Sequence, residues 1–169
     1  DELTKIPNRR GFMMLAENSL SLCNRQNIPA ALAFIDLDNF KPINDKFGHA
    51  EGDRALIAFV NTIRKFIRDS DLFARLGGDE FVLFFIDATI KQAEAKIDEI
   101  SRLLISYNKE ANRGYEIAFS YGIVEFNPES NSTLTKMLAD GDSLMYKVKE
   151  KKRKNELTTK GHSTKYFVH

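Results

Sequence analysis

The sequence predicts an α+β domain in which helices pack a mixed, mainly antiparallel central sheet. Amphipathic helical patterns alternate with short apolar runs along the 169 residues, of which 43% are apolar. Gly77-Gly78 separates two such runs, residues 72–76 and 81–86, and is expected to supply the positive φ angles of a two-residue hairpin turn. A hairpin pairs its strands antiparallel, which argues against a doubly wound parallel sheet.

The first half of the chain shows one strand and three helices. Residues 30–35 are a continuous apolar run, which predicts a central strand with Asp36, Leu37 and Asp38 at its C-terminal edge. The expected helices cover residues 9–25 after Asn8, residues 40–47 with Gly48-His49 as the closing turn, and residues 51–67.

The second half continues with helix, strand and helix. An amphipathic helix is expected from Ile90 to Leu104, and a strand over residues 116–126, where Gly122 marks a bulge or a close approach. Polar residues 127–133 form a turn, and residues 134–152 the last helix. We interpret residues 1–155 as the domain and residues 156–169 as a C-terminal tail, whether native or appended.

Composition narrows the class of protein. No apolar stretch approaches the ~20 residues of a membrane span, no secretion signal is visible, and a single cysteine excludes an internal disulfide. We therefore expect a cytoplasmic domain, which is compatible with a membrane-anchored full-length protein. Because the chain begins inside a motif at Asp1, we expect a sensory or regulatory domain upstream.

Charge is distributed unevenly over the chain. The segment from Lys147 onward holds eight Lys and Arg against two Glu, which leaves a net charge of −5 on the remainder. A nucleic-acid-binding protein would spread its basic surface more widely, so we expect no nucleic-acid partner. One basic segment beside an acidic body suits a small phosphorylated ligand.

Two groups of acids suggest a metal site. Asp79 and Glu80 adjoin a hydrophobic strand at the predicted hairpin, where neighbouring carboxylates are costly without a cation. Asp36 and Asp38 share one side of their strand, so three or more carboxylates converge if that strand lies next to the hairpin. Oxygen ligands of this kind suit Mg²⁺ or Mn²⁺. The alternatives are a solvated turn at the hairpin and a helix-capping role for Asp38.

The segment after the first strand is suited to a nucleotide. The helix that opens at Phe40 offers free backbone N–H groups to phosphate, and Lys41 in its first turn adds a positive charge. Asn44 and Asp53 are a pair that can read a guanine edge. Taken singly, Asn44 is a solvated helix residue and Asp53 an acid that the helix dipole favours, and His49 is interpreted as a turn residue.

Three stretches together resemble a known family. RLGGDEF, FIDLDNFKPINDKFGHAEGD and the opening DELTKIPNRRGF are similar to the GGDEF domain of diguanylate cyclases, in the same order and at similar separations. The resemblance covers residues 1–155. It implies a fold similar to nucleotidyl cyclase catalytic domains and an enzyme that condenses two GTP into cyclic di-GMP and two pyrophosphates.

The resemblance also implies roles for individual residues. Two Mg²⁺ ions per active site would be held by Asp36, the Leu37 carbonyl, Asp79 and Glu80, and one of the last two would help to deprotonate the ribose 3′-hydroxyl. Gly77 and Gly78 would let the backbone approach the nucleotide. The GTP-binding residues would be Asn44 and Asp53 for guanine, Lys41, Lys149 and Arg153 for the phosphates, and Phe40. Each subunit would hold one GTP, so catalysis would require a homodimer.

A second site is implied upstream of the hairpin. Arg68 and Asp71 match the family's RxxD inhibitory motif, which implies inhibition by the cyclic di-GMP product. An arginine fork suits the Hoogsteen edge of guanine, and a carboxylate suits its Watson–Crick edge. The alternative is an exposed Arg–Asp pair worth about 0–1 kcal/mol.

The chain departs from the family pattern at two places. Lys5-Ile6 replaces the usual Gly-Leu, which we interpret as a surface change. On the last helix, Lys152 stands where the family tends to have glycine and Lys154 where it tends to have asparagine, so a basic solvated helix end remains an alternative to phosphate binding.

Rival functions follow from these features. They are a catalytically silent module that binds GTP or cyclic di-GMP for signalling, a cyclase for another nucleotide, and a small structural domain.

Overall fold

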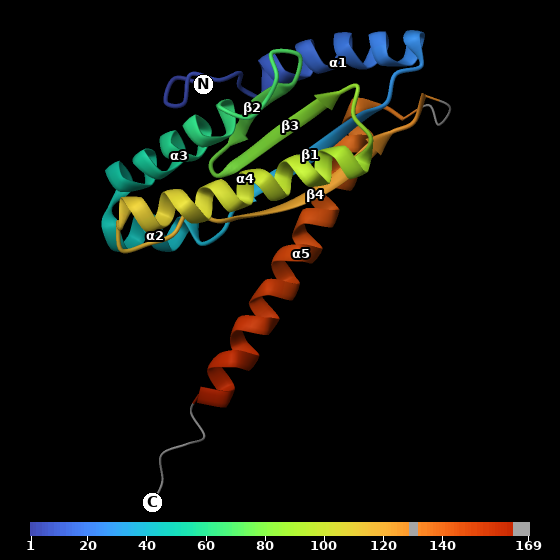
Figure 1. Cartoon of the computed structure of the whole chain (residues 1–169). Coiled ribbons are helices and arrows are strands. Elements are labelled where there is room, and N and C mark those ends of the chain that lie inside the picture. The colour runs from blue at the N-terminus through green and yellow to red at the C-terminus, as the bar shows by residue number, and fades with distance from the viewer. Residues whose placement is uncertain (129–131, 164–169) are drawn as a thin grey trace, which may run out of the picture.

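The computed structural model describes the backbone of residues 1–128 and 132–163, and side chains as far as Asn155. Its centre is a four-stranded sheet in the order β2-β3-β1-β4, in which each neighbouring pair is antiparallel (Figure 1). The strands are β1 (Ala30–Leu37), β2 (Leu72–Gly77), β3 (Glu80–Ile86) and β4 (Phe119–Phe126). The α+β prediction is confirmed. Within the described residues, parallel pairing is limited to an isolated bridge between Asn8 and Arg75.

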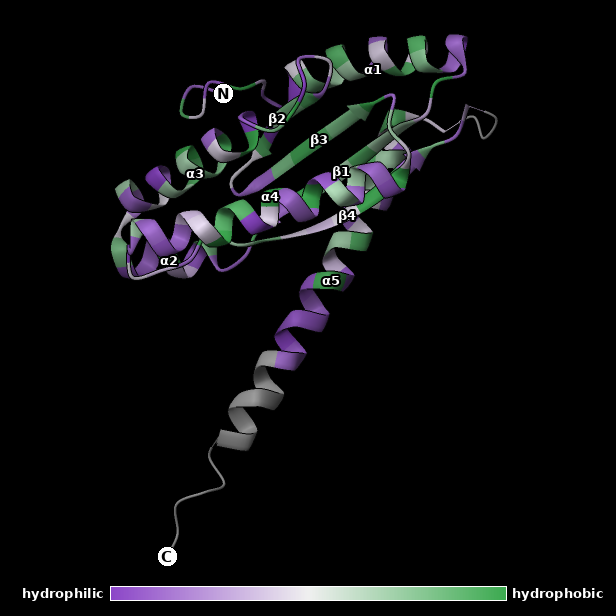
Figure 2. Cartoon of the chain, in the orientation of Figure 1, coloured by the Kyte–Doolittle hydropathy of each residue, from purple (hydrophilic) through white to green (hydrophobic). Residues whose placement is uncertain are grey.

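Helices cover both faces of the sheet. They are α1 (Arg9–Gln26), α2 (Phe40–Phe47), α3 (His49–Arg64), α4 (Ile90–Ala111) and α5 (Leu134–Ser163). Helices α3 and α4 pack on one face and α1 and α5 on the other, and alternate residues of β1 enter the two cores. Burial on both faces explains why β1 is continuously apolar. Figure 2 shows β1 and β3 coloured mainly as hydrophobic, and α2 and the outer part of α5 coloured mainly as hydrophilic.

Several boundaries differ from the predictions. Helix α3 begins at His49, which is therefore a helical residue, and ends at Arg64. Strand β4 begins at Phe119, because the Asn108 side chain donates to the Ile117 carbonyl at 2.9 Å and accepts from its N–H at 2.9 Å. Helix α5 continues past the expected end at residue 152. The predicted turn over residues 127–133 lies partly outside the described residues.

The hairpin turn lies one residue later than expected. Gly77 pairs with Glu80, so Gly78 and Asp79 form the two-residue turn. Both glycines have positive φ, 154° at Gly77 and 50° at Gly78, as the sequence predicted. The shift places Asp79 at the tip of the hairpin and Glu80 in the ladder beside β1.

Gly122, predicted as a bulge or a close approach, lies where β4 meets α5. A Cβ on Gly122 would lie 2.2 Å from the carbonyl oxygen of Gly141, so Gly122 is a close approach between β4 and α5.

The surface interpretation of Lys5-Ile6 is wrong for Ile6, which is 6% exposed. Lys5 is exposed and has a φ of 57°, a conformation that favours the glycine of the family pattern.

Candidate functional site

The end of β1 lies directly beside the hairpin. Asp36 is opposite Glu80 in the antiparallel β1–β3 register, and the Leu37 N–H donates to the Asp79 carbonyl at 3.1 Å. Two segments more than 40 positions apart are thus brought together by strand pairing (Figure 1). The predicted adjacency of the two acidic motifs is present in the structure.

A lysine from α5 contacts two of the predicted metal ligands. The Lys149 ammonium forms a close ion pair with the Asp36 carboxylate and lies 3.4 Å from the Leu37 carbonyl oxygen. Both side chains are about 85% buried, Asp36 being 15% and Lys149 16% exposed. The carboxylate and the carbonyl therefore point at one position, which a cation occupies.

Asp36 carries a charge that its surroundings compensate incompletely. Its pKa is raised from 3.8 to about 6: burial is the largest cause, the nearby Asp79 and Glu80 also raise the pKa, and the contact with Lys149 lowers it. A carboxylate in this condition binds a divalent cation readily, because the ion offsets both the desolvation and the neighbouring negative charges.

The acids do not form a closed cluster. Among the described side chains, no three acidic, His or Cys residues lie close enough to surround a metal ion, so the expected convergence of three or more carboxylates is not met. Instead, Glu80 Oε2 lies 3.8 Å from Arg9 Nη2 of α1, and Asp36 pairs with Lys149, so these two acids have separate basic partners.

These donors nevertheless fit magnesium. Mg²⁺ is typically held by one or two carboxylates together with substrate phosphates, and does not need an all-protein cage. Asp36 and the Leu37 carbonyl already share one cationic partner, and Asp79 adjoins them at the hairpin tip. The glycines at the tip have open space where a Cβ would be, which leaves room for a ligand.

Asp38 has a role that sequence reasoning misassigned. It does not cap α2, whose N-cap residue is Asn39 at a φ of 58° and makes no side-chain capping bond. Instead, the Asp38 carboxylate accepts from Ser120 Oγ and from Lys152 Nζ, each at 2.7 Å. Asp38 therefore joins the end of β1 to β4 and α5.

The predicted guanine readers lie at the junction of α2 and α3. Asn44 is half-buried because its amide packs on Gly52, where a Cβ would lie 1.9 Å from Asn44 Oδ1. Asp53 is exposed at the start of α3 and Lys41 is exposed on α2, while Phe40 is half-buried. Gly52 was missed by sequence reasoning, although its place between the two predicted readers was a signal.

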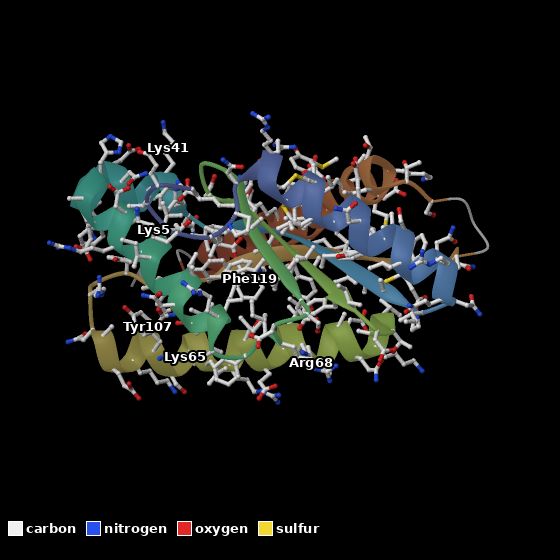
Figure 3. All side chains as sticks on the ribbon, turned by 90° about the horizontal axis from the view of Figure 1, so that it is seen from above. Lys5, Lys41, Lys65, Arg68, Tyr107 and Phe119 are labelled. Atoms are coloured by element: carbon white, nitrogen blue, oxygen red, sulfur yellow. The ribbon has the colours of Figure 1, made fainter. Side chains whose placement is uncertain are left out.

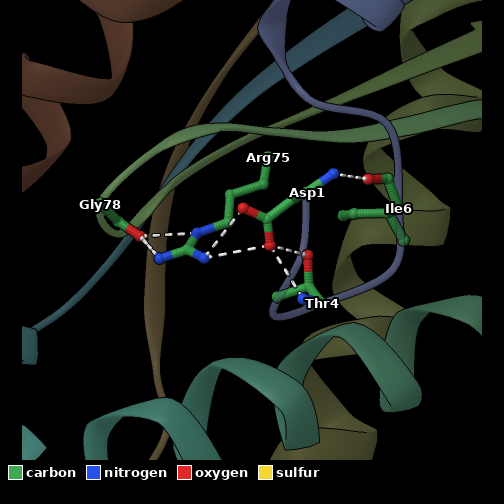
Figure 4. A network of polar contacts seen from close by, with 5 residues as sticks. All are labelled: Asp1, Thr4, Ile6, Arg75 and Gly78. Atoms are coloured by element: carbon green, nitrogen blue, oxygen red, sulfur yellow. Dashed lines mark hydrogen bonds and ion pairs between the residues drawn. The ribbon is translucent and has the colours of Figure 1, made fainter.

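A second missed feature holds the hairpin in place (Figure 4). Arg75 Nε and Nη2 donate to the Gly78 carbonyl at 2.9 and 2.7 Å, and Nη1 donates to Asp1 at 3.1 Å. The Asp1 carboxylate also accepts from the N–H and hydroxyl of Thr4. Burial lowers the pKa of Arg75, whereas Asp53 and Asp79 raise it, so both acids lie near this guanidinium. Arg75 fixes the turn that presents Asp79.

The predicted inhibitory pair lies apart from this site. Figure 3 shows Arg68 beside α4, well separated from Lys41. Asp71 is 7% exposed, and its carboxylate accepts from the Arg68 N–H at 3.0 Å and pairs with Lys96 at 3.3 Å. The two residues are thus linked through backbone, and not as an exposed side-chain pair. The Arg68 side chain is exposed.

Besides Lys149, α5 carries a second basic residue that was predicted at the phosphates. Arg153 is exposed on α5, one turn beyond Lys149.

Comparison with known proteins identifies the family. The family model described as "Diguanylate cyclase, GGDEF domain" matches residues 1–155. The chain belongs to the GGDEF domain family. The resemblance in sequence is therefore confirmed.

Individual relatives agree with this assignment. The chain is 35% identical over 159 residues to diguanylate cyclase DgcP of Escherichia coli, covering 91% of this chain and 45% of that protein. Among solved structures, it is similar to the GGDEF domain of TpbB from Pseudomonas aeruginosa, with 35% identity, a TM-score of 0.79, and coverage of 89% of this chain and 88% of that one. The GGDEF domain of DgcB from Caulobacter crescentus, solved in complex with c-di-GMP, has 25% identity, a TM-score of 0.81 and 89% coverage of both chains.

The chain spans less than half the length of the curated relatives it matches. In the part of α1–α5 that the structure describes, no helix combines the length and apolar character of a membrane span.

Proposed function

We propose that this GGDEF domain is a diguanylate cyclase that condenses two GTP molecules into cyclic di-GMP with release of two pyrophosphates. The observation that carries the proposal is the position of Asp36. Its carboxylate and the Leu37 carbonyl converge on one cationic position beside the hairpin that holds Asp79 and Glu80. The relatives named as diguanylate cyclases support the same reaction.

Binding and orientation of GTP are assigned to residues around this edge. Asn44 and Asp53 at the α2–α3 junction read the guanine edge, and the lack of a side chain at Gly52 leaves the space that the Asn44 amide occupies. The N–H groups of the first turn of α2, from Phe40, and the Lys41 side chain meet the phosphates. Lys149 and Arg153 of α5 add positive charge at the triphosphate. The glycines at the hairpin let its backbone approach the nucleotide.

The chemical step is a nucleotidyl transfer, performed twice. The 3′-oxygen of one GTP forms a bond to the α-phosphorus of the other, and the bond between that phosphorus and the pyrophosphate oxygen breaks. Asp79 or Glu80 accepts the hydroxyl proton. When bound by Asp36, the Leu37 carbonyl, Asp79 and Glu80, two Mg²⁺ ions supply Lewis-acid stabilisation of the attacking and leaving oxygens. Mn²⁺ suits the same oxygen donors.

Two domains are required because each holds a single GTP. We propose that a homodimer places the two half-sites face to face, so that each 3′-hydroxyl meets the α-phosphate held by the partner. A sensory or regulatory domain upstream would control this encounter, since relatives that match this chain are more than twice as long.

Product inhibition is proposed at Arg68 and Asp71. The exposed Arg68 guanidinium is available to a guanine base of cyclic di-GMP. Asp71 is held by the Arg68 N–H and by Lys96, so its contribution is to fix the turn or to exchange one of these bonds for the base. The separation of Arg68 from Lys41 makes the inhibition allosteric (Figure 3).

The test is incubation of the purified protein with GTP and Mg²⁺, followed by chromatography of the products. We expect cyclic di-GMP and pyrophosphate in a ratio of one to two, and no product from Asp79→Ala. The rate should rise faster than linearly with protein concentration while dimers assemble. Binding of GTP by a demonstrated dimer without turnover would instead indicate a silent binding module.

A further inference from the structure

Lys152 joins the outer part of α5 to the turn that follows β1. Its Nζ donates to Asp38 Oδ2 at 2.7 Å and to the Phe119 carbonyl at 2.8 Å, and so reaches the ends of two neighbouring strands. Resting on the proposed function, we propose that Lys152 is a positioning residue for the triphosphate site. It holds the part of α5 that carries Lys149, and the turn before α2, in place beside the proposed phosphate position.

The first half of this inference concerns α5. The helix packs closely on the sheet where Gly141 meets Gly122, and Lys152 lies 11 residues further on, about 16 Å along the helix axis. Residues 150–155 are all exposed, and from this stretch the Lys152 side chain reaches back to the sheet. Lys149 lies between the two anchors, three residues before Lys152, and therefore projects from the same side of the helix.

The second half concerns the turn between β1 and α2. Asp38, the partner of Lys152, precedes Asn39, which has a left-handed φ of 58° and whose carbonyl accepts from the Ile43 N–H at 3.2 Å. This turn leads directly into α2, whose first N–H groups are assigned to the phosphates in the proposed function. One lysine thus fixes the two elements, α5 and the α2 turn, that approach a triphosphate from different sides.

The exposure of the Lys152 ion pair favours a role in positioning α5 and the α2 turn over a role in stabilising the fold. The Lys152 side chain is 46% exposed, and ion pairs that are this open to solvent contribute little to folding free energy. Small displacements of groups that bind a reactant can still change binding severalfold.

The variants for a test are available on the same helix. Lys152→Met removes the charge and keeps most of the stem, and Lys152→Arg keeps the charge. Lys151→Met is the matched control, because Lys151 is an exposed neighbour on α5 and loses the same charge. The probes are GTP for steady-state kinetics, and 3′-deoxy-GTP and GMP for calorimetric binding with Mg²⁺. The 3′-deoxy nucleotide cannot act as the nucleophile, so its binding is measured without turnover.

We expect Lys152→Met to raise the KM for GTP and the Kd for 3′-deoxy-GTP about fivefold, with kcat within twofold of the wild type. The Kd for GMP should not change, because the guanine readers lie at the α2–α3 junction. Lys152→Arg and Lys151→Met should both stay within about twofold of the wild type. A change in KM without a change in kcat is the result expected when groups that bind substrate and transition state equally are displaced.

Three results would overturn the inference. One is an unchanged KM and Kd in Lys152→Met. Another is an equal rise in Lys151→Met, which would indicate general charge. The third is a lower kcat and Tm at constant KM, which would indicate a structural role alone. If the wild type binds 3′-deoxy-GTP but makes no cyclic di-GMP, the proposed function fails while the binding comparison still tests Lys152. If it binds 3′-deoxy-GTP no better than GMP, both fail.

Discussion

Asp36 and Asp71 are two largely buried aspartates, each paired with a lysine from a distant helix, yet their surroundings differ. Asp71 is held by its own turn, through the Arg68 N–H, and by Lys96, and its side chain is 2% exposed. Asp36 has Lys149 on one side and two further acids, Asp79 and Glu80, near it, and its pKa is raised to about 6.

The difference separates a carboxylate whose charge is matched by its partners from one that also faces neighbouring negative charges. Hydrogen bonds within the turn satisfy Asp71, so its burial serves the fold. The charge of Asp36 is opposed by burial and by like charges, a combination that clusters at sites where a cation or a substrate completes the balance. The neighbours of the two aspartates thus decide how completely each carboxylate is compensated.

The largest effect should follow removal of the Asp36 charge. Asp36→Asn is expected to lower the rate of cyclic di-GMP formation by about 10³-fold or more, equivalent to about 4 kcal/mol, because the amide cannot replace a carboxylate as a magnesium ligand. The fold should be retained, as measured by circular dichroism. Asp98→Asn, which changes an exposed acid on α4, is the matched control and should keep its activity. Substantial turnover by the Asp36 variant would remove this residue from the site.

The pH dependence of stability should distinguish Asp36 from an ordinary acid. Its pKa rises from 3.8 in the reference state to about 6 in the folded protein, so the folded state binds the proton more tightly. In protein kept free of metal with EDTA, this group should therefore lower the unfolding free energy as pH rises from about 4 to 6, by at most about 3 kcal/mol. Denaturant titrations at several pH values should show this fall in the unfolding free energy in the wild type. The fall should be absent in Asp36→Asn. Identical slopes would mean that Asp36 is not desolvated.

Removal of the Asp71 charge should lower stability and leave catalysis nearly unchanged. Asp71→Asn is expected to lower the unfolding free energy by about 2 kcal/mol, because Lys96 loses its buried partner. The kcat of the remaining folded protein should stay within about twofold of the wild type. Chemical denaturation and kinetics on the same preparation measure both quantities. A large loss of kcat without loss of stability would erase the contrast with Asp36.

Arg68 should have the smallest effect on stability. Arg68→Ala removes an exposed side chain and should change the unfolding free energy by about 0.5 kcal/mol or less. It should nevertheless raise the inhibition constant of cyclic di-GMP at least tenfold, as determined from initial rates at several product concentrations. Unchanged inhibition would show that the product binds elsewhere.

Much of the fold follows from local pattern. The continuous apolar run of β1, the paired glycines of the hairpin and the periodicity of α1 and α4 predicted these elements, because each pattern reflects burial within the element itself. From the sequence, Asp36 could be expected near the hairpin only if the two strands were neighbours in the sheet. This proximity depends on which strands become neighbours, and strand order is set by packing of the whole domain.

The contacts that hold the site could not be predicted in the same way. Lys149 on Asp36, Lys152 on Asp38 and Arg75 between Asp1 and Gly78 each join segments far apart in sequence. The geometry of the two lysine contacts depends on how α5 crosses the sheet, where Gly122 and Gly141 allow close approach. The hairpin turn was misplaced by one residue, because two adjacent glycines permit positive φ in either register.

The central claim is that Asp36 and the hairpin together hold the metal that serves GTP. A crystal structure with 3′-deoxy-GTP and Mg²⁺ tests it directly. We predict an ion about 2.1 Å from an Asp36 oxygen and from the Leu37 carbonyl oxygen, next to Asp79, with the Lys149 ammonium moved to the triphosphate. A bound nucleotide with no ion between Asp36 and the hairpin, and with Lys149 still on Asp36, would contradict the account.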